Sequence, residues 1–411
     1  MLFLSSFKST VLLWFLVLTT CGNPTAKTDT DHEGATLLEN YKKYDSVLVA
    51  ANRTVEYIPL LKGKKIAIVA NQTSVIFKND GYTHLVDSLV ALNIEITKVF
   101  APEHGFRGQV DAGEHVKNST DTQTGLPLIS LYGKNRKPSQ EQLDGLDMVL
   151  FDIQDVGVRF YTYIATLQLV MEACAEKGIP VMVLDRPNPN GHYVDGPTME
   201  AEHISFLGMN KIPLVYGMTI GEYAQMINEE GWLADGGKAD LTVIPMQHWS
   251  HETFYHLPIR PSPNLPNDTS ITLYPSLGLF EGTNVNAGRG TEFQFQRYGA
   301  SFLDSTAYDF TYTPKPNFGS KHPKEEGKLC YGKDLSKSPR MNEVTMNYII
   351  DAYSHAAEKS KFFLTSGFTK HAGTEKLQKQ IEAGLSNAEI KASWQPDLEN
   401  FKKIRAKYLI Y

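Results

Sequence analysis

The sequence predicts an α/β protein, with a domain built on a parallel sheet followed by a smaller α+β domain. From Lys64 onward, short β-branched apolar runs alternate with amphipathic stretches of helical spacing. Such alternation is typical of parallel strands connected by helices. The character changes after residue 300, where aromatic strand-like pieces and separate helical patterns follow. With 411 residues, 42% of them apolar, the chain is long enough for two cores.

The predicted elements follow one another in a regular order. Strands are expected at 64–70, 94–100, 127–133, 147–153, 181–185 and 241–249, and helices at 83–93, 163–178 and 217–231. A Pro- and Asn-rich passage at 258–268 indicates a long irregular loop. In the smaller domain, we expect a strand at 308–314, a helix at 344–359, and a C-terminal helix that includes Trp394, Phe401 and Tyr408. The predicted domains therefore span residues 45–299 and 300–411.

The first 21 residues have the build of a signal peptide. Lys8 precedes an apolar stretch from Val11 to Leu18 that is too short to span a bilayer comfortably. Cys21 follows directly, as in a lipoprotein processing site, although a plain secretory peptide is the alternative. The polar residues 22–44 are expected to form a tether. We therefore expect an exported protein, periplasmic or on the cell surface, whose membrane contact is a lipid anchor on Cys21.

Charge and cysteine content exclude several classes of protein. The formal net charge is -6 and no run of Lys and Arg stands out, so nucleic acid is a poor candidate partner. Beyond Cys21, the chain has two cysteines, Cys174 and Cys330, too few for a disulfide framework. Cys174 shares the apolar face of a predicted helix and is expected in the core.

Polar loops follow the predicted strands, and several of them carry acids. Because ligands of α/β sheets bind beyond the carboxyl ends of the strands, these loops are expected to converge on one site. Glycoside hydrolysis needs one protonated carboxyl group and a second ionised group. The candidate carboxyl groups are Glu103, Glu114, Asp152 and Asp155. Glu103 is the preferred acid or base because it follows a buried strand, although it could instead cap a helix or pair with Arg107.

Three arginines and two tyrosines indicate an anion- and sugar-binding cleft. Arg159, Arg186 and Arg289 lie among Gly, Pro or aromatic residues, and a guanidinium group fits a carboxylate. Tyr161 and Tyr163 could offer flat faces to a sugar. The alternative for each is an internal salt bridge or core packing.

Metal chemistry is a weaker alternative. Glu103 with His104, and Glu114 with His115, are potential ligands, and Asp152 could complete a divalent site. The HExxH pattern, clustered cysteines, the GxxxxGK[ST] phosphate loop and the GxSxG elbow are all missing.

Ten motifs in order give the chain a resemblance to a known family. They include APEHGFRG, FDIQDVGVRFYTYIATL, VLDRPNPNG, LYPSLGLFEGTN, GRGT and HAGTEKLQKQI. From about residue 45 to the C-terminus, the sequence resembles the exo-β-N-acetylmuramidases of the NamZ type. The resemblance implies a Rossmann-like domain, a smaller second domain, a cleft between them and no cofactor. It also implies release of N-acetylmuramic acid (MurNAc) from the non-reducing ends of peptidoglycan-derived MurNAc-GlcNAc saccharides.

The resemblance and the reasoning from the residues together predict roles for particular residues. The predicted catalytic residues are Glu103, His104, Asp155 and Asp152. The predicted substrate-binding residues are Arg107, Glu114, Gln154, Arg159, Tyr161, Tyr163, Arg186, Asn188, Asn284 and Arg289. Many relatives carry Ser-Glu before GRGT, whereas this chain has Asn286 and Ala287, so the second carboxylate stays open. A metal-dependent hydrolase and a non-catalytic lipoprotein that binds wall fragments remain the alternatives.

Overall fold

A seven-stranded sheet forms the centre of the N-terminal half. The computed structural model describes residues 47–108 and 118–411. The sheet has the order β11-β8-β7-β1-β4-β6-β5, and every pair is parallel except β5–β6. Its strands are β1 (Ile66–Ala70), β4 (Ile96–Ala101), β5 (Ser119–Thr120), β6 (Pro127–Ser130), β7 (Met148–Asp152), β8 (Val181–Leu184) and β11 (Leu241–Ile244).

The strand order is that of a doubly wound sheet. The chain runs outward from β1 through β4 to β6, then returns to the other side of β1 and runs outward again through β7, β8 and β11. The direction reverses between β1 and β7, and ligands of such sheets bind near this reversal. The predicted Rossmann-like α/β fold is confirmed.

Local sequence explains where these elements begin and end. Every residue of β1, β7 and β8 is buried, as expected for strands covered on both faces. Helix α4 (Tyr163–Lys177) ends at Gly178, whose φ of 70° suits glycine. Helix α5 (Ile220–Glu229) begins with a capping box between Thr219 and Glu222. The other helices of this half are α2 (Thr54–Leu61) and α3 (Leu85–Ala91), and two hairpins complete it: β2 (Val75–Lys78) with β3 (Gly81–His84), and β9 (Asp195–Thr198) with β10 (Pro213–Val215).

The C-terminal half combines helices with a small antiparallel sheet of order β12-β14-β13. These strands are β12 (Arg297–Ala300), β13 (Phe310–Tyr312) and β14 (Cys330–Asp334), and the helices are α6 (Asp268–Leu277), α7 (Asn347–Ser354), α8 (Thr365–Ala372), α9 (Lys376–Glu382) and α10 (Asn387–Arg405). The smaller α+β domain is thus confirmed, while the boundary at residue 300 stays a prediction. Helix α6 begins at the last residue of the passage that was expected to be irregular. The structure closes its first turn with a capping box between Asn267 and Ser270.

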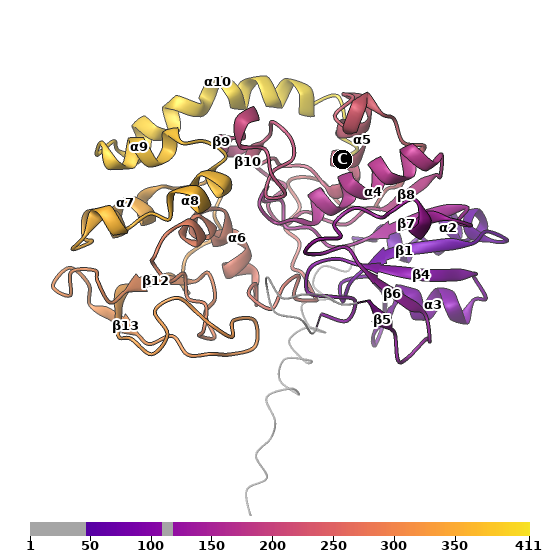
Figure 1. The fold of residues 1–411 in the computed structure, drawn as a ribbon, viewed down its shortest axis with the longest axis horizontal. Helices are drawn as coiled ribbons and strands as arrows, with labels where there is room; N and C mark the ends of the chain where they lie inside the picture. Colours follow the sequence, from indigo (N-terminus) through magenta and orange to yellow (C-terminus); the bar gives the residue numbers. More distant parts are fainter. Residues whose placement is uncertain (1–46, 109–117) are drawn as a thin grey trace, which may run out of the picture.

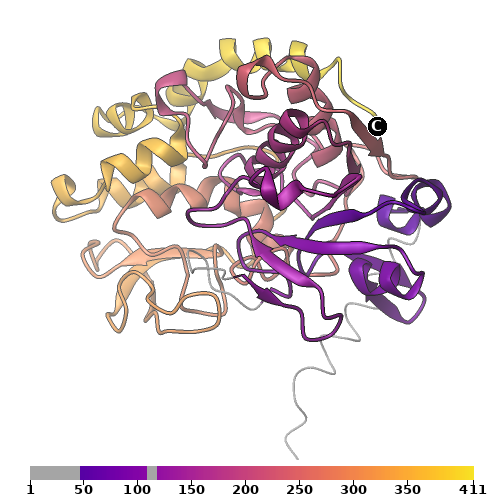
Figure 2. The same ribbon diagram turned by 45° about the vertical axis from the view of Figure 1, so that its right-hand side comes forward.

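The end of the chain returns to the parallel sheet. Figures 1 and 2 show the yellow helix α10 crossing the top of the molecule and leading the C-terminus back beside α5. The hydroxyl group of Tyr411 donates a hydrogen bond to Asp185, just beyond β8, at 2.7 Å. Arg405 donates to the carbonyl group of Gly217. The two halves are therefore joined by polar contacts as well as by packing.

The predictions for the cysteines and the termini have different outcomes. Cys174 is fully buried in the core, as expected, and burial raises the pKa of its thiol to about 12. Cys330 is also buried and free. The predicted signal peptide, Cys21 and tether lie outside the described residues, as does Glu114. Across 47–108 and 118–411, none of the helices combines the length and apolar character needed to cross a membrane.

Candidate active site

Both halves of the chain line one cavity of about 420 Å³. One wall comes from loops that follow β4, β6 and β7, near the reversal of the sheet. The other wall comes from α6, the 3-10 helix η5 (Gly278–Gly282), the loop after it, and α8. The lining residues are Glu103, His104, Tyr132, Arg136, Phe160, Tyr161, Thr162, Tyr163, Ser205, Phe206, Leu207, Ser262, Asn264, Leu265, Tyr274, Glu281, Arg289, Phe295, Lys370 and His371. A cavity of this size fits a small polar molecule.

Glu103 lies in the wall formed by the sheet. It follows β4, and the hydroxyl group of Thr162 donates a hydrogen bond to its Oε2 atom at 3.1 Å. Burial, and then the charge and hydrogen bond of Glu103, raise the pKa of Tyr132 well above its usual value. Tyr132 therefore stays protonated and can donate to the Glu103 carboxylate. These two hydroxyl groups hold the carboxyl group in the cavity wall.

His104 has an uncommon backbone conformation. Its φ is 69°, in the left-handed region that residues other than glycine rarely adopt, and Gly105 follows at 76°. Its Nε2 atom lies 3.3 Å from the hydroxyl oxygen of Ser262. Strained backbone of this kind is concentrated at binding and catalytic sites. The turn presents Glu103 and His104 side by side to the cavity.

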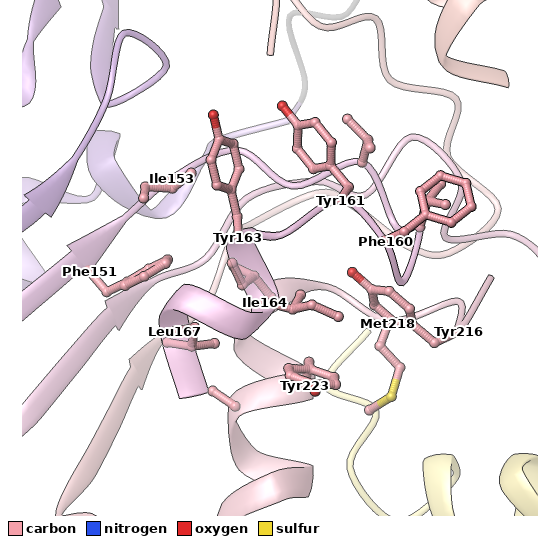
Figure 3. Close-up of a cluster of buried hydrophobic side chains, with 14 of the residues drawn as sticks. Phe151, Ile153, Phe160, Tyr161, Tyr163, Ile164, Leu167, Tyr216, Met218 and Tyr223 are labelled. Carbon is pink, nitrogen blue, oxygen red and sulfur yellow. The ribbon is translucent and has the colours of Figure 1, made fainter. Parts of the chain in front are cut away.

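Tyr161 and Tyr163 form an aromatic edge of the cavity. Their ring centroids lie 4.8 Å apart with an interplanar angle of 74°. Figure 3 shows both hydroxyl groups pointing to the same side, away from α4 and the apolar side chains beneath it. Tyr161 donates to the carbonyl group of Pro261 at 2.6 Å, and burial raises the pKa of both phenols. Both tyrosines line the cavity, and their contact with a sugar stays a prediction.

A second carboxylate, Glu281, lies in the opposite wall. Its Oε2 atom accepts a hydrogen bond from Arg289 Nη1 at 3.1 Å, and its side chain is 26% exposed. Burial alone would raise the pKa of Glu281, but the positive charges of Arg289, Lys324 and His371 outweigh burial and lower it. Glu281 is therefore ionised at neutral pH.

The position of Glu281 depends on close packing between η5 and α8. A Cβ atom on Gly282 would lie 2.3 Å from the Cα atom of Phe368 in α8. Lys324 donates hydrogen bonds to the carbonyl groups of Phe280, Glu281 and Thr283. The backbone on both sides of Glu281 is thus fixed. The sequence prediction did not include Glu281, although it is the acid in the LYPSLGLFEGTN motif.

Asp152 and Asp155 lie behind the cavity and are not among its lining residues. Asp152 is fully buried and makes a bidentate ion pair with Arg186, with N–O distances of 2.6 and 2.8 Å. Asp155 accepts hydrogen bonds from the backbone N–H of Gly157 and from the hydroxyl group of Tyr216. Burial raises the pKa of Asp155 to about 6, although both hydrogen bonds oppose this shift. Both aspartates therefore hold loops that support the cavity wall.

Arg159, Gln154 and Asn188 are also buried supports. The guanidinium group of Arg159 donates to the carbonyl groups of Pro197, Ile212, His371 and Ala372, and burial lowers its pKa to about 9. The amide of Gln154 donates to the carbonyl groups of Asp155 and Pro187. The amide of Asn188 donates to Met218. Arg159 thereby joins the N-terminal half of the chain to α8.

The other predicted binding residues are distributed more widely. Arg289 lines the cavity and pairs with Glu281, whereas Arg107 pairs with Asp87 and Asp121 away from it. Asn284 donates to the carbonyl group of Lys361 and is not in the lining. Of the residues named for the metal alternative, Glu114 and His115 lie outside the described residues, and Asp152 is paired with Arg186 outside the lining. In the described part of the chain, the acidic group with metal-ligand spacing is Glu200, Glu202 and His203, none of which lines the cavity.

Comparisons with known proteins agree on one family. Two family models match, both described as exo-beta-N-acetylmuramidase NamZ: the N-terminal model over residues 66–269 and the C-terminal model over residues 272–411. The curated peptidoglycan beta-N-acetylmuramidase NamZ of Bacillus subtilis (strain 168) is 40% identical in an alignment of 409 positions that covers 95% of this chain and 93% of that protein.

Two crystal structures of DUF1343 family proteins from Bacteroides fragilis NCTC 9343 have the same fold. The first is 44% identical with a TM-score of 0.81, and the second is 26% identical with a TM-score of 0.73. Each comparison covers 89% of this chain and 99% of the other. The fold, the motifs that form the cavity and the match of two family models over nearly all of the described residues lead to one assignment. The chain belongs to the exo-beta-N-acetylmuramidase NamZ family.

Proposed function

We propose that this chain is an exo-acting glycosidase that releases MurNAc from the non-reducing ends of peptidoglycan fragments. The Bacillus subtilis relative is named a peptidoglycan beta-N-acetylmuramidase, and its similarity extends over 95% of this chain. The observation that carries the proposal is a pair of carboxyl groups, Glu103 and Glu281, in opposite walls of one cavity. A volume of about 420 Å³ suits a terminal sugar better than a long glycan chain.

The two carboxyl groups differ in a way that suits glycoside hydrolysis. Glu281 lies beside Arg289, which keeps it ionised, so it can stabilise the positive charge that develops at the anomeric carbon. Glu103 follows β4 in the opposite wall and is the proposed acid. In the proposed reaction, Glu103 gives its proton to the bridging oxygen as the bond to the anomeric carbon breaks. Water then supplies a hydroxyl group to that carbon and loses its remaining proton to a carboxylate of the pair.

The test is release of para-nitrophenol from the β-MurNAc glycoside, with the β-GlcNAc glycoside as the comparison substrate. We expect Glu103→Gln to lower kcat by about 10²- to 10⁴-fold, as for loss of an acid catalyst. Glu281→Gln should also lower kcat strongly. Glu229→Gln serves as the control, because Glu229 is an exposed carboxylate paired with Lys238 and is not among the lining residues. If the wild type releases para-nitrophenol from neither glycoside, the proposed activity is refuted. If Glu103→Gln cleaves as fast as the wild type, Glu103 is not the acid catalyst.

We also propose that the protein is exported and lipid-anchored through Cys21. The charge at Lys8, the short apolar stretch from Val11 to Leu18 and the cysteine that follows support this proposal. In a bacterial host, wild-type protein should enter the detergent phase and incorporate labelled fatty acid, whereas Cys21→Ser should do neither. Equal partitioning of the two proteins would argue for a plain secretory peptide.

A further inference from the structure

The cavity contains cationic side chains with very different surroundings. Arg289 donates hydrogen bonds to the carboxylate of Glu281 at 3.1 Å and to the carbonyl group of Gly319 at 3.2 Å. Arg159 and Arg186, two further arginines that the sequence suggested for anion binding, are buried, do not line the cavity, and are bonded to backbone carbonyl groups and to Asp152, respectively. Two exposed cations remain in the lining, Arg136 and Lys370. These are the groups that can bind an anionic substituent of a ligand.

The loop that carries Arg136 is fixed on both sides of this residue. The amide of Asn135 donates to the carbonyl group of Ser130 at 2.7 Å, and Lys137 makes an ion pair with Glu176 of α4 at 2.5 Å. The guanidinium group of Arg136 lies over the ring of Phe206, 4.3 Å from its centroid. No ion pair joins Arg136 to a carboxylate within the described residues. An arginine placed over an aromatic ring is held in position while its N–H groups can still donate to a ligand.

Arg136 lies near the same end of the cavity as Glu103. Tyr132 connects the two: it is hydrogen-bonded to Glu103, and the charge of Arg136 also acts on its phenol. Tyr132 and Arg136 both belong to the loop after β6. A sugar whose glycosidic oxygen meets Glu103 therefore has neighbouring substituents within reach of Arg136. Lys370 belongs to α8, which contributes to the opposite wall.

We infer that Arg136, stacked on Phe206, binds the lactyl carboxylate of MurNAc and makes the cavity selective for MurNAc over N-acetylglucosamine (GlcNAc). The inference rests on the proposed function and assigns its sugar selectivity to one side chain. The two sugars differ by the lactyl ether, whose carboxylate has the planar shape that a guanidinium fork binds in a bidentate manner. Lysine presents a point charge and lacks this geometry.

The test is calorimetric titration of the full chain with MurNAc, GlcNAc and MurNAc whose lactyl group is a primary amide. Binding is measured without turnover, so the result does not depend on the chemistry. We expect Arg136→Gln to weaken MurNAc binding by about 10- to 100-fold, the range of a hydrogen-bonded charge pair. Affinity for GlcNAc and for the amide should not change. Arg136→Lys should restore only part of the loss, and Lys370→Gln should keep the wild-type preference.

A kinetic measurement separates this inference from the proposed function. With the para-nitrophenyl glycosides, Arg136→Gln should raise KM for the MurNAc substrate while kcat changes little. If the wild type binds MurNAc selectively and Arg136→Gln loses that selectivity, the inference stands even where no glycoside is cleaved. Equal affinity of the wild type for all three sugars would overturn it. Loss of selectivity in Lys370→Gln but not in Arg136→Gln would also overturn the inference. That result would mean that Lys370 of α8, and not Arg136, binds the lactyl carboxylate.

Discussion

Replacing Asp155 by asparagine tests whether this buried carboxyl group supports the fold or takes part in the reaction. Asp155 is 3% exposed, and burial raises its pKa from 3.8 to about 6. Between these two pH values, the folded protein keeps a proton on Asp155 that the unfolded chain has lost. The stability contributed by this proton is complete below pH 3.8 and decreases as the pH rises to about 6. The pKa difference corresponds to about 3 kcal/mol.

Asparagine resembles the protonated form and does not titrate. Its oxygen can accept the hydrogen bonds that Gly157 and Tyr216 now donate to Oδ2, while Oδ1 of Asp155 has no hydrogen-bond partner. In urea unfolding from about pH 4 to 7, we expect the stability of the variant relative to wild type to improve by up to about 3 kcal/mol as the pH rises. Cleavage of the MurNAc glycoside should be retained, because Asp155 does not line the cavity. A stability difference that stays constant over this pH range would refute the reasoning, and a loss of cleavage beyond about 100-fold would favour the catalytic role predicted from the sequence.

Three further substitutions test the supports of the cavity. Arg159→Met removes hydrogen bonds to four carbonyl groups and should lower the free energy of unfolding, measured in urea, by about 3 kcal/mol. A change below about 1 kcal/mol would contradict the role of Arg159 in joining the N-terminal half to α8. Asp152→Asn leaves the buried Arg186 without its carboxylate and should cost about 3–5 kcal/mol, seen as a lower midpoint of unfolding. Gly282→Ala forces η5 and α8 apart, so it should lower the free energy of unfolding by about 1–3 kcal/mol and reduce cleavage. Gly367→Ala is the control and should be tolerated, because the nearest atom to a Cβ at this position lies 3.7 Å away. Equal effects of the two alanine substitutions would argue against the close contact at Gly282.

The strands were predictable because the apolar runs are short, β-branched and bounded by polar loops. The runs at 66–70 and 148–152 became β1 and β7, whose residues are all buried. The position of the site was also predictable, because the carboxyl ends of parallel strands meet at one edge of a sheet. Helix α6 was missed because Pro275 and the prolines before it masked its helical pattern. The usable signal was the Asn267 and Ser270 pair that caps its first turn.

The roles of individual polar side chains were less predictable, because their partners are distant in the sequence. Asp152 and Glu103 look alike when only the strand beside each is considered, and what distinguishes Asp152 is its ion pair with Arg186, which follows β8. Asp155 is likewise distinguished by Tyr216. Such pairings leave no local pattern in the sequence. The two tyrosines at the cavity edge were easier to place, because they lie where the loop after β7 leads into the first turn of α4.

The missing acid before GRGT does not leave the cavity without a second carboxylate. In this chain, the amide of Asn286 donates to the carbonyl groups of Arg289 and Lys324, at 3.0 and 2.8 Å, and so fixes the loop that carries Arg289. Arg289 in turn pairs with Glu281, which precedes Asn286 in the same segment and lines the cavity. Asn286 therefore acts on the site through backbone contacts, and Glu281 supplies the charge. If this division of roles is right, Asn286→Ala should lower the midpoint of urea unfolding and slow cleavage of the MurNAc glycoside in proportion. Glu281→Gln, which leaves Arg289 without its carboxylate, should lower the midpoint somewhat but reduce cleavage far more than Asn286→Ala does.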